Sequence, residues 1–224
     1  CKVNSRYLLK MQNSFLKCDY FFFPPLTSKK ILNRYKKKIS HINFIVGDFK
    51  KIKKGNNLKK CLIMDNGKRS LSTLIDKTVP YLEKIKDIEF HISIDYLSEK
   101  FKSIIYNSDN IIPVSGVKDM HQRLAETDFL IARGGFNTIS ECLVLKKPAL
   151  FFREENNDEI AENLRQIYNK RGLASLITKD EWGKNIEKKL RSFIKTDGKK
   201  LYKKLSRKKF KFNGASQVVK IISK

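Results

Sequence analysis

The residues best suited to chemistry lie in one segment, residues 128–163, which reads DFLIARGGFNTISECLVLKKPALFFREENNDEIAEN. Within it, an apolar run ends in Gly134-Gly135 and a helical pattern begins at once with Phe136, Asn137 and Thr138. A helix N-terminus carries a partial positive charge, and glycines let the backbone approach an anion closely. The pattern therefore indicates a phosphate site, to which the Thr138 hydroxyl would add a donor.

Glu141 lies one helical turn beyond this glycine pair. A carboxylate close to a phosphate is repelled by it, so Glu141 needs another reason to be there. An ionised carboxylate accepts hydrogen bonds only, and it can take both vicinal hydroxyls of a ribose. This favours a nucleotide over bare phosphate. The alternative, from the residues alone, is that the glycines merely turn the chain and Glu141 is a surface residue.

The elements that must position this segment follow from alternating apolar runs and amphipathic stretches. Apolar spacing predicts helices within residues 71–82 and 160–168, and a third from about 181 to 193 with Asp180 as its N-cap. The pattern predicts an α/β fold with a Rossmann-like parallel sheet and helices on both faces. Six runs are predicted strands, at residues 60–65, 88–94, 110–114, 128–132, 148–152 and 173–177.

The first sixty residues have a different pattern, with predicted strands at 19–23 and 41–46. We expect residues 1–49 to be the tail of a truncated amino-terminal domain, residues 50–59 a linker, and residues 60–224 the ligand-binding domain. A start at Cys1, where a methionine would stand, indicates a fragment or a processed chain.

The motif R-G-G-F-N-T-I-S-E, followed by K-P-A-L-F-F and E-N-N-D-E-I-A-E-N, resembles the carboxy-terminal domain of nucleotide-sugar glycosyltransferases of the GT-B fold. The chain is similar to the family that contains the UDP-N-acetylglucosamine transferase of peptidoglycan synthesis. The resemblance runs from about Lys60 to the closing helix NGASQVVKIISK. It implies a metal-independent hexosyltransferase that takes a UDP-sugar as donor substrate and needs no cofactor. It names no catalytic base, because in that family the base comes from the amino-terminal domain.

The resemblance also assigns roles by position. Glu141 would bind the ribose. Residues 114–120 (VSGVKDM) resemble the uracil pocket, which implies backbone contacts from Val117 and packing by Met120; otherwise these two are ordinary core residues. The diphosphate would be held by the glycine turn and the amides after it, at Gly134, Gly135, Phe136, Asn137 and Thr138.

In that family the donor sugar is read by polar residues after the KPAL strand, often a Gln pair or Asp-Gln. Here Asn157, Asp158 and Glu159 stand in that place, which leaves the sugar open. The same residues would also serve to cap the next helix. Lys68 or Arg69 is a further candidate for a phosphate contact. Lys50 matches a phosphate-binding arginine of some relatives, although a solvated linker lysine is the simpler interpretation.

The net charge of +25 comes from 48 Lys+Arg against 23 Asp+Glu, and it favours anionic partners such as an anionic membrane surface or a lipid-linked acceptor. Lysines that simply fill solvated positions are the plainer explanation. The basic clusters match no nucleic-acid signature, so a nucleic-acid partner is not expected. No apolar stretch approaches the roughly 20 residues of a membrane span.

The four cysteines lie far apart and lack a companion histidine at metal-ligand spacing, so neither a metal site nor a disulfide framework is indicated. We expect Cys61 and Cys142 in the core and the protein in the cytoplasm, with the cytoplasmic membrane face as a peripheral location. His91 and His121 are expected to be structural.

Three functions stay open at this point. The first is a glycosyltransferase that transfers a sugar from a UDP-sugar to a lipid-linked or glycan acceptor. The second is a UDP-sugar hydrolase or 2-epimerase of the same fold, for which Arg153 is an argument. The third is a non-catalytic, basic nucleotide-binding module.

Overall fold

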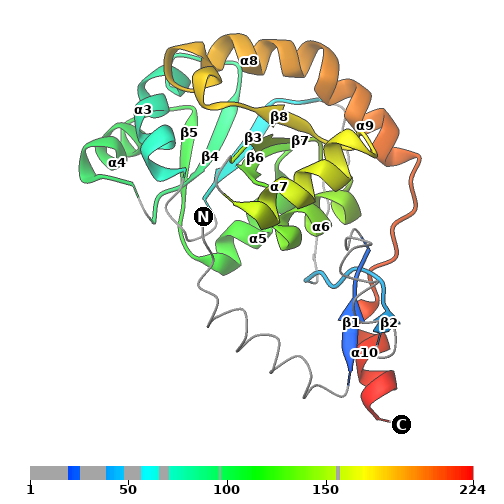
Figure 1. Cartoon of the computed structure of the whole chain (residues 1–224). Coiled ribbons are helices and arrows are strands. Elements are labelled where there is room, and N and C mark those ends of the chain that lie inside the picture. Colours follow the sequence, from blue (N-terminus) through cyan, green and yellow to red (C-terminus); the bar gives the residue numbers. More distant parts are fainter. Residues whose placement is uncertain are drawn as a thin grey trace. The chain divides into compact units, whose positions relative to one another are not determined.

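The computed structural model describes residues 20–25, 39–47, 57–65, 71–95, 97–154 and 157–223 (Figure 1). Internal contacts divide the chain into two units, one of Cys1–Ile45 with Lys211–Lys224 and one of Val46–Phe210. The larger unit holds the sheet and the segment with the double glycine.

The larger unit is built on a six-stranded, fully parallel sheet with the strand order β5-β4-β3-β6-β7-β8. All six strands predicted from the apolar runs are confirmed. Parallel strands covered on both faces read as continuous apolar runs, and β6 and β7 are buried at every position. The strands are β3 (Lys60–Met64), β4 (Glu89–Ser93), β5 (Ile111–Val114), β6 (Phe129–Arg133), β7 (Ala149–Phe152) and β8 (Ser175–Ile177).

Helices cover both faces of this sheet, which confirms the Rossmann-like α/β prediction. In Figure 1, α3, α4 and α8 lie on one side and α5, α6 and α7 on the other. Right-handed crossovers require this, because the strand order runs outward in opposite directions from β3 and from β6. The helices are α3 (Ser72–Leu82), α4 (Glu99–Tyr106), α5 (Val117–Glu126), α6 (Phe136–Leu145), α7 (Asp158–Leu164), α8 (Ile186–Ser192) and α9 (Gly198–Ser206).

The strand order reverses between the neighbouring strands β3 and β6. Ligands of open parallel sheets bind at such a switch point, beyond the carboxyl ends of the strands. Strand β6 ends at Arg133, so Gly134 and Gly135 follow it at this edge and lead directly into α6.

Two predicted boundaries are wrong. Helix α8 begins at Ile186 rather than at 181, because residues 179–185 form two 3-10 turns, Lys179–Glu181 and Gly183–Asn185. Thr178 and Glu181 form a capping box on the first turn, so Asp180 is not the N-cap of α8. The strand predicted at 41–46 is instead β2, Ile39–His41.

The smaller unit pairs β1 (Phe21–Phe23) with β2 in parallel and includes the last helix, α10 (Gly214–Ile222). The chain before α10 returns to residues 43–45: Ile45 bridges Asn213, and Gln217 Oε1 accepts the Asn43 N–H at 2.6 Å. A Cβ on Gly214 would lie 2.2 Å from the Asn43 carbonyl oxygen, so only glycine fits at the start of this helix.

Buried polar and sulfur groups fix several junctions in the larger unit. Cys61 and Cys142 are buried free thiols, as predicted. Lys147, 4% exposed, donates to the carbonyl oxygens of Ala125, at 2.9 Å, and of Thr127. One ammonium therefore joins the C-terminal end of α5 to the turn after α6. Among the described helices, none combines the length and apolar character needed to cross a bilayer.

Candidate functional site

A pocket of about 220 Å³ opens where β6 passes into α6. The corner between these two elements is open rather than filled by side chains, as the predicted phosphate site requires. Six residues predicted from the sequence and two others line it: Arg133, Gly135, Phe136, Asn137, Thr138, Asn157, Glu159 and Ile160.

The two glycines are needed for a reason other than backbone torsion. Gly135, the N-cap of α6, has φ −66 and ψ 146, values that any residue adopts. Gly134 is constrained by packing, because a Cβ there would lie 2.7 Å from Leu164 Cδ2 and 2.9 Å from Cγ on α7. Gly134 thus lets α7 approach the turn, and Asn163 Nδ2 donates to its carbonyl oxygen at 3.2 Å.

The second wall of the pocket is the N-terminal end of α7. Asn157 caps this helix, since its Oδ1 accepts the Ile160 N–H at 3.1 Å. Asn157 therefore fulfils the capping alternative and also lines the pocket, together with the exposed Glu159. The Asp158 side chain lies outside the described residues.

Arg133 is a pocket residue that the sequence analysis did not assign. It is the last residue of β6, its side chain is 6% exposed, and its Nη2 lies 2.7 Å from Glu154 Oε2. The sequence signal was present, because an arginine directly before a glycine turn at the end of a strand is placed to contact an anion there.

Glu141 is not a surface residue, because its side chain is 13% exposed. It lies outside the lining of the pocket, further along α6, where its Oε1 is 2.8 Å from Nε2 of His121 on α5. Burial raises the pKa of Glu141, and the charge and hydrogen bond of His121 act to lower it. The structure thus gives the carboxylate a partner that the sequence did not predict.

The predicted base-binding segment forms the start of α5. Val117 is its first residue, and Met120 is half-buried one turn later. The turn before the helix is held by Asp95, whose Oδ1 accepts the Ser115 hydroxyl at 2.7 Å and whose Oδ2 accepts the Gly116 N–H at 3.2 Å. Gly116 has φ 74, a left-handed value that favours glycine.

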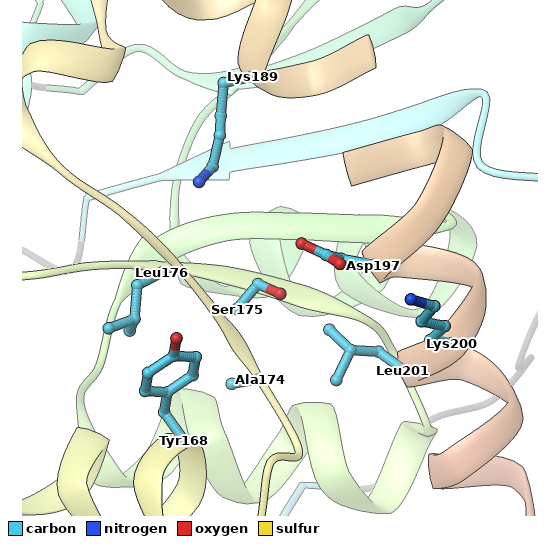
Figure 2. Close-up of a pocket in the computed structure, with 8 residues that line it drawn as sticks. All are labelled: Tyr168, Ala174, Ser175, Leu176, Lys189, Asp197, Lys200 and Leu201. Atoms are coloured by element: carbon cyan, nitrogen blue, oxygen red, sulfur yellow. The ribbon is translucent and has the colours of Figure 1, made fainter. Parts of the chain in front are cut away.

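Two further pockets share no lining residue with the pocket at the start of α6. One, of about 530 Å³, is lined by Arg153, Glu154 and Arg165 among others; Arg153 does not line the pocket at α6. The other, of about 310 Å³, has side chains of Lys189, Asp197 and Lys200 around it (Figure 2), and Lys189 is engaged by Glu181 at 2.8 Å. None of the predicted site residues lines either pocket.

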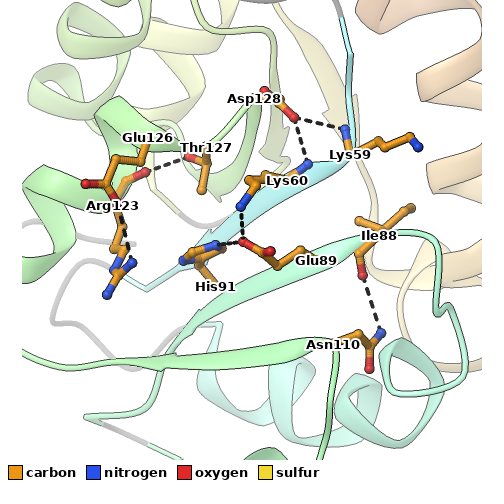
Figure 3. A network of polar contacts seen from close by, with 10 residues as sticks. All are labelled: Lys59, Lys60, Ile88, Glu89, His91, Asn110, Arg123, Glu126, Thr127 and Asp128. Carbon is orange, nitrogen blue, oxygen red and sulfur yellow. Dashed lines mark hydrogen bonds and ion pairs between the residues drawn. The ribbon is translucent and has the colours of Figure 1, made fainter. Parts of the chain in front are cut away.

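His91, the other histidine predicted to be structural, belongs to a polar network near the amino-terminal ends of the strands (Figure 3). His91 Nε2 lies 2.6 Å from Glu89 Oε1, which also accepts from Lys60 Nζ at 2.7 Å. Asp128 Oδ2 accepts the backbone N–H groups of Lys59 and Lys60. This network joins the starts of β3, β4 and β6, away from the glycine turn.

Lys50, Lys68 and Arg69, the other candidates for a phosphate contact, lie outside the described residues. Within the described ranges, the His, Cys, Asp and Glu side chains form no group of three that could hold a metal ion.

Solved structures with a similar fold include the glycosyltransferase SnogD. SnogD from Streptomyces nogalater aligns with a TM-score of 0.58 and 13% identity over 90% of this chain and 54% of its own. MurG from Acinetobacter baumannii aligns with a TM-score of 0.59 and 15% identity over 97% of this chain and 75% of MurG. Phytolacca americana UGT2, complexed with UDP-2fluoro-glucose and pterostilbene, aligns with a TM-score of 0.61 and 11% identity. That alignment covers 87% of this chain and 50% of UGT2. The chain thus spans about half the length of SnogD and of UGT2.

These likenesses confirm the fold that the sequence resemblance implied. No curated protein sequence matches the chain at a significant level. A family model described as the glycosyltransferase family 28 C-terminal domain matches residues 66–219. That range includes the β6–α6 turn, the α7 wall and the His121–Glu141 pair, and it exceeds half of the chain. The chain therefore belongs to the family of glycosyltransferase family 28 C-terminal domains.

Proposed function

We propose that this chain binds the donor substrate of a metal-independent hexosyltransferase, and that the donor is a UDP-sugar. The observation that carries the proposal is the pocket in which the glycine-led start of α6, the start of α7 and Arg133 come together. Membership of the glycosyltransferase family supports the reaction class.

The diphosphate is proposed to lie at the N-terminal end of α6, against Gly134, Gly135, Phe136, Asn137 and Thr138. When the bond to the sugar breaks, negative charge develops on the departing UDP. A helix N-terminus and a neighbouring arginine are fixed in place before the reaction, so they stabilise this charge without reorganising. Arg133 also lines this pocket, and its guanidinium, which is paired with Glu154, is proposed as the cationic group beside the diphosphate.

The nucleoside is proposed to extend from α6 toward α5. Glu141 would accept the two ribose hydroxyls, the Val117 backbone would contact the uracil, and Met120 would pack against it. The UGT2 structure with UDP-2fluoro-glucose supports this class of donor, since that protein has the same fold. The sugar would face Asn157, Asp158 and Glu159 at the start of α7.

The acceptor is proposed to be lipid-linked or a glycan, met at the cytoplasmic face of a membrane. Helix α9 supports this, because it buries Leu201 and Leu205 and exposes Lys199, Lys200 and Lys203 on its other side. Such a lysine face is attracted to anionic lipids. Co-sedimentation should show binding to vesicles that contain phosphatidylglycerol and none to vesicles of phosphatidylcholine alone.

Calorimetry with UDP, ADP and GDP tests the donor assignment. We expect a clear preference for UDP, and equal or absent binding of the three nucleotides would contradict it. Glu141→Ala should reduce the affinity for UDP more than the affinity for inorganic pyrophosphate, because only UDP carries a ribose. Glu187→Ala is the matched control, since this glutamate is exposed on α8; it should change neither affinity.

A further inference from the structure

His121 and Glu141 meet from two helices that have different parts in the proposed site. The 2.8 Å contact joins Nε2 on α5 to Oε1 on α6. In the proposed function, α5 contacts the base and α6 contacts the diphosphate and the ribose. The pair therefore links the two elements that would hold the nucleoside.

We propose that His121 is a positioning residue for the ribose: it holds one carboxylate oxygen of Glu141 and leaves the other to accept the vicinal hydroxyls. This inference rests on the proposed function and deepens it, because it makes the site selective for a ribonucleotide over its 2′-deoxy analogue.

The environment of Glu141 explains why such a partner matters. Its side chain is mostly buried, and burial raises its pKa, whereas the charge and hydrogen bond of His121 counteract that effect. A protonated carboxyl would carry a donor hydrogen and offer fewer acceptor positions to the sugar. His121 therefore favours the acceptor-only form of the group.

The ring of His121 also packs against Gly47. A Cβ on Gly47 would lie 2.6 Å from Cε1 and 3.1 Å from Nδ1 of His121, so the imidazole packs directly on the glycine. The ring therefore contacts both this glycine and the Glu141 carboxylate. A side chain at position 47 would push the ring away from its place.

Two substitutions at His121 test whether the length of the side chain matters when its polar group is an amide in both. The Nε2 of glutamine stands about as far from the backbone as the Nε2 of histidine, so His121→Gln keeps a donor for Glu141. Asparagine carries the same amide on a shorter side chain, and His121→Asn removes the contact. A role limited to packing or helix propensity would not distinguish the two in their selectivity.

The test measures the affinities of the full chain for UDP, 2′-deoxy-UDP and pyrophosphate by calorimetry. Hydrogen bonds from a sugar hydroxyl to an ionised carboxylate predict that the wild type prefers UDP over 2′-deoxy-UDP by about tenfold to a hundredfold. His121→Asn should reduce this ratio to within about twofold of one and leave pyrophosphate unchanged. His121→Gln should retain most of the ratio. Gln122→Ala, the exposed neighbour on α5, is the control and should match the wild type.

The outcomes separate this inference from the proposed function. A wild type that fails to prefer UDP over ADP and GDP contradicts the proposed function. A wild type that prefers UDP, with a ribose ratio that His121→Asn leaves intact, overturns the role of His121. Should His121→Asn fail to fold, as judged by circular dichroism, Gly47→Ala displaces the ring without removing it. An unchanged ratio in that variant would equally overturn the inference.

Discussion

Arg133 and Glu154 form a partly buried ion pair that joins the end of β6 to the segment after β7. Arg133 donates from Nε and from Nη2 to the same oxygen, Glu154 Oε2, at 3.0 and 2.7 Å. Arg133 directly precedes Gly134, so this pair sets the position of the cationic group in the candidate site. The carboxylate also balances a positive charge that is almost fully removed from water.

Removal of that carboxylate should therefore destabilise the fold. Glu154→Gln leaves the buried guanidinium without a counter-charge, and we expect a loss of about 2–3 kcal/mol in the free energy of unfolding. The double variant Arg133→Met with Glu154→Gln should lose less than the single one, because no uncompensated charge remains. Urea denaturation measures both. A double variant at least as unstable as Glu154→Gln would show that the pair is not the cause.

Gly134→Ala tests the close approach of α7 to the glycine turn. The added Cβ meets the Leu164 side chain, so that side chain or α7 itself must shift, at an expected cost of about 1–3 kcal/mol. Because Asn157 and Glu159 lie at the start of α7, both UDP and pyrophosphate should bind more weakly. Combining the change with Leu164→Ala relieves the contact and should restore part of both affinities; no recovery would indicate another origin.

Asp95→Asn tests the turn that precedes the predicted base contact. The substitution replaces the acceptor of the Gly116 N–H by an amide, which loosens the left-handed turn before Val117. We expect UDP to bind several-fold more weakly, with pyrophosphate unchanged, since one charge-assisted hydrogen bond is affected. Asp109→Asn, at an exposed aspartate before β5, serves as the control. A parallel loss for pyrophosphate would speak against a specific role in the base pocket.

His91 predicts a pH dependence of stability. Burial lowers the pKa of His91, Glu89 acts in the opposite sense, and Arg123 and Lys60 lower it further. The native state therefore binds fewer protons than the unfolded state once the pH falls to the unfolded pKa of about 6.5. The free energy of unfolding should therefore be lower at pH 5.5 than at pH 7.5.

His91→Asn removes this titration, so its free energy of unfolding should change less between the two pH values. Urea denaturation at each pH measures the difference. Glu89 does not confound the comparison, because its lowered pKa places its own effect at more acidic pH. Equal declines in the two proteins would rule out His91 as the source.

The sheet could be predicted from the sequence because buried parallel strands are continuous apolar runs, and all six runs are strands. The glycine turn was equally visible, since β6, Gly134-Gly135 and α6 are contiguous. Local signals failed where two patterns competed: Thr178 and Glu181 cap a short 3-10 turn, and Gly183, with φ 62, delays α8 to Ile186.

Contacts between separate helices could not be predicted. Nothing in the spacing of His121 and Glu141 indicates that they meet, because their separation depends on how α5 and α6 pack on the sheet. Gly134 shows the same limit: its neighbour Leu164 is remote in sequence, and the backbone torsions of the turn do not explain why a Cβ is excluded there.

The buried ammonium of Lys147 has a mechanical consequence for the candidate site. It fastens the C-terminal end of α5 to the turn after α6, at the opposite ends of these helices from Val117 and Phe136. The His121–Glu141 contact ties the same two helices at a second point along their length. Two ties resist a rotation that one would allow, so the spacing between Val117 and Phe136 is set by the packed protein before any nucleotide arrives.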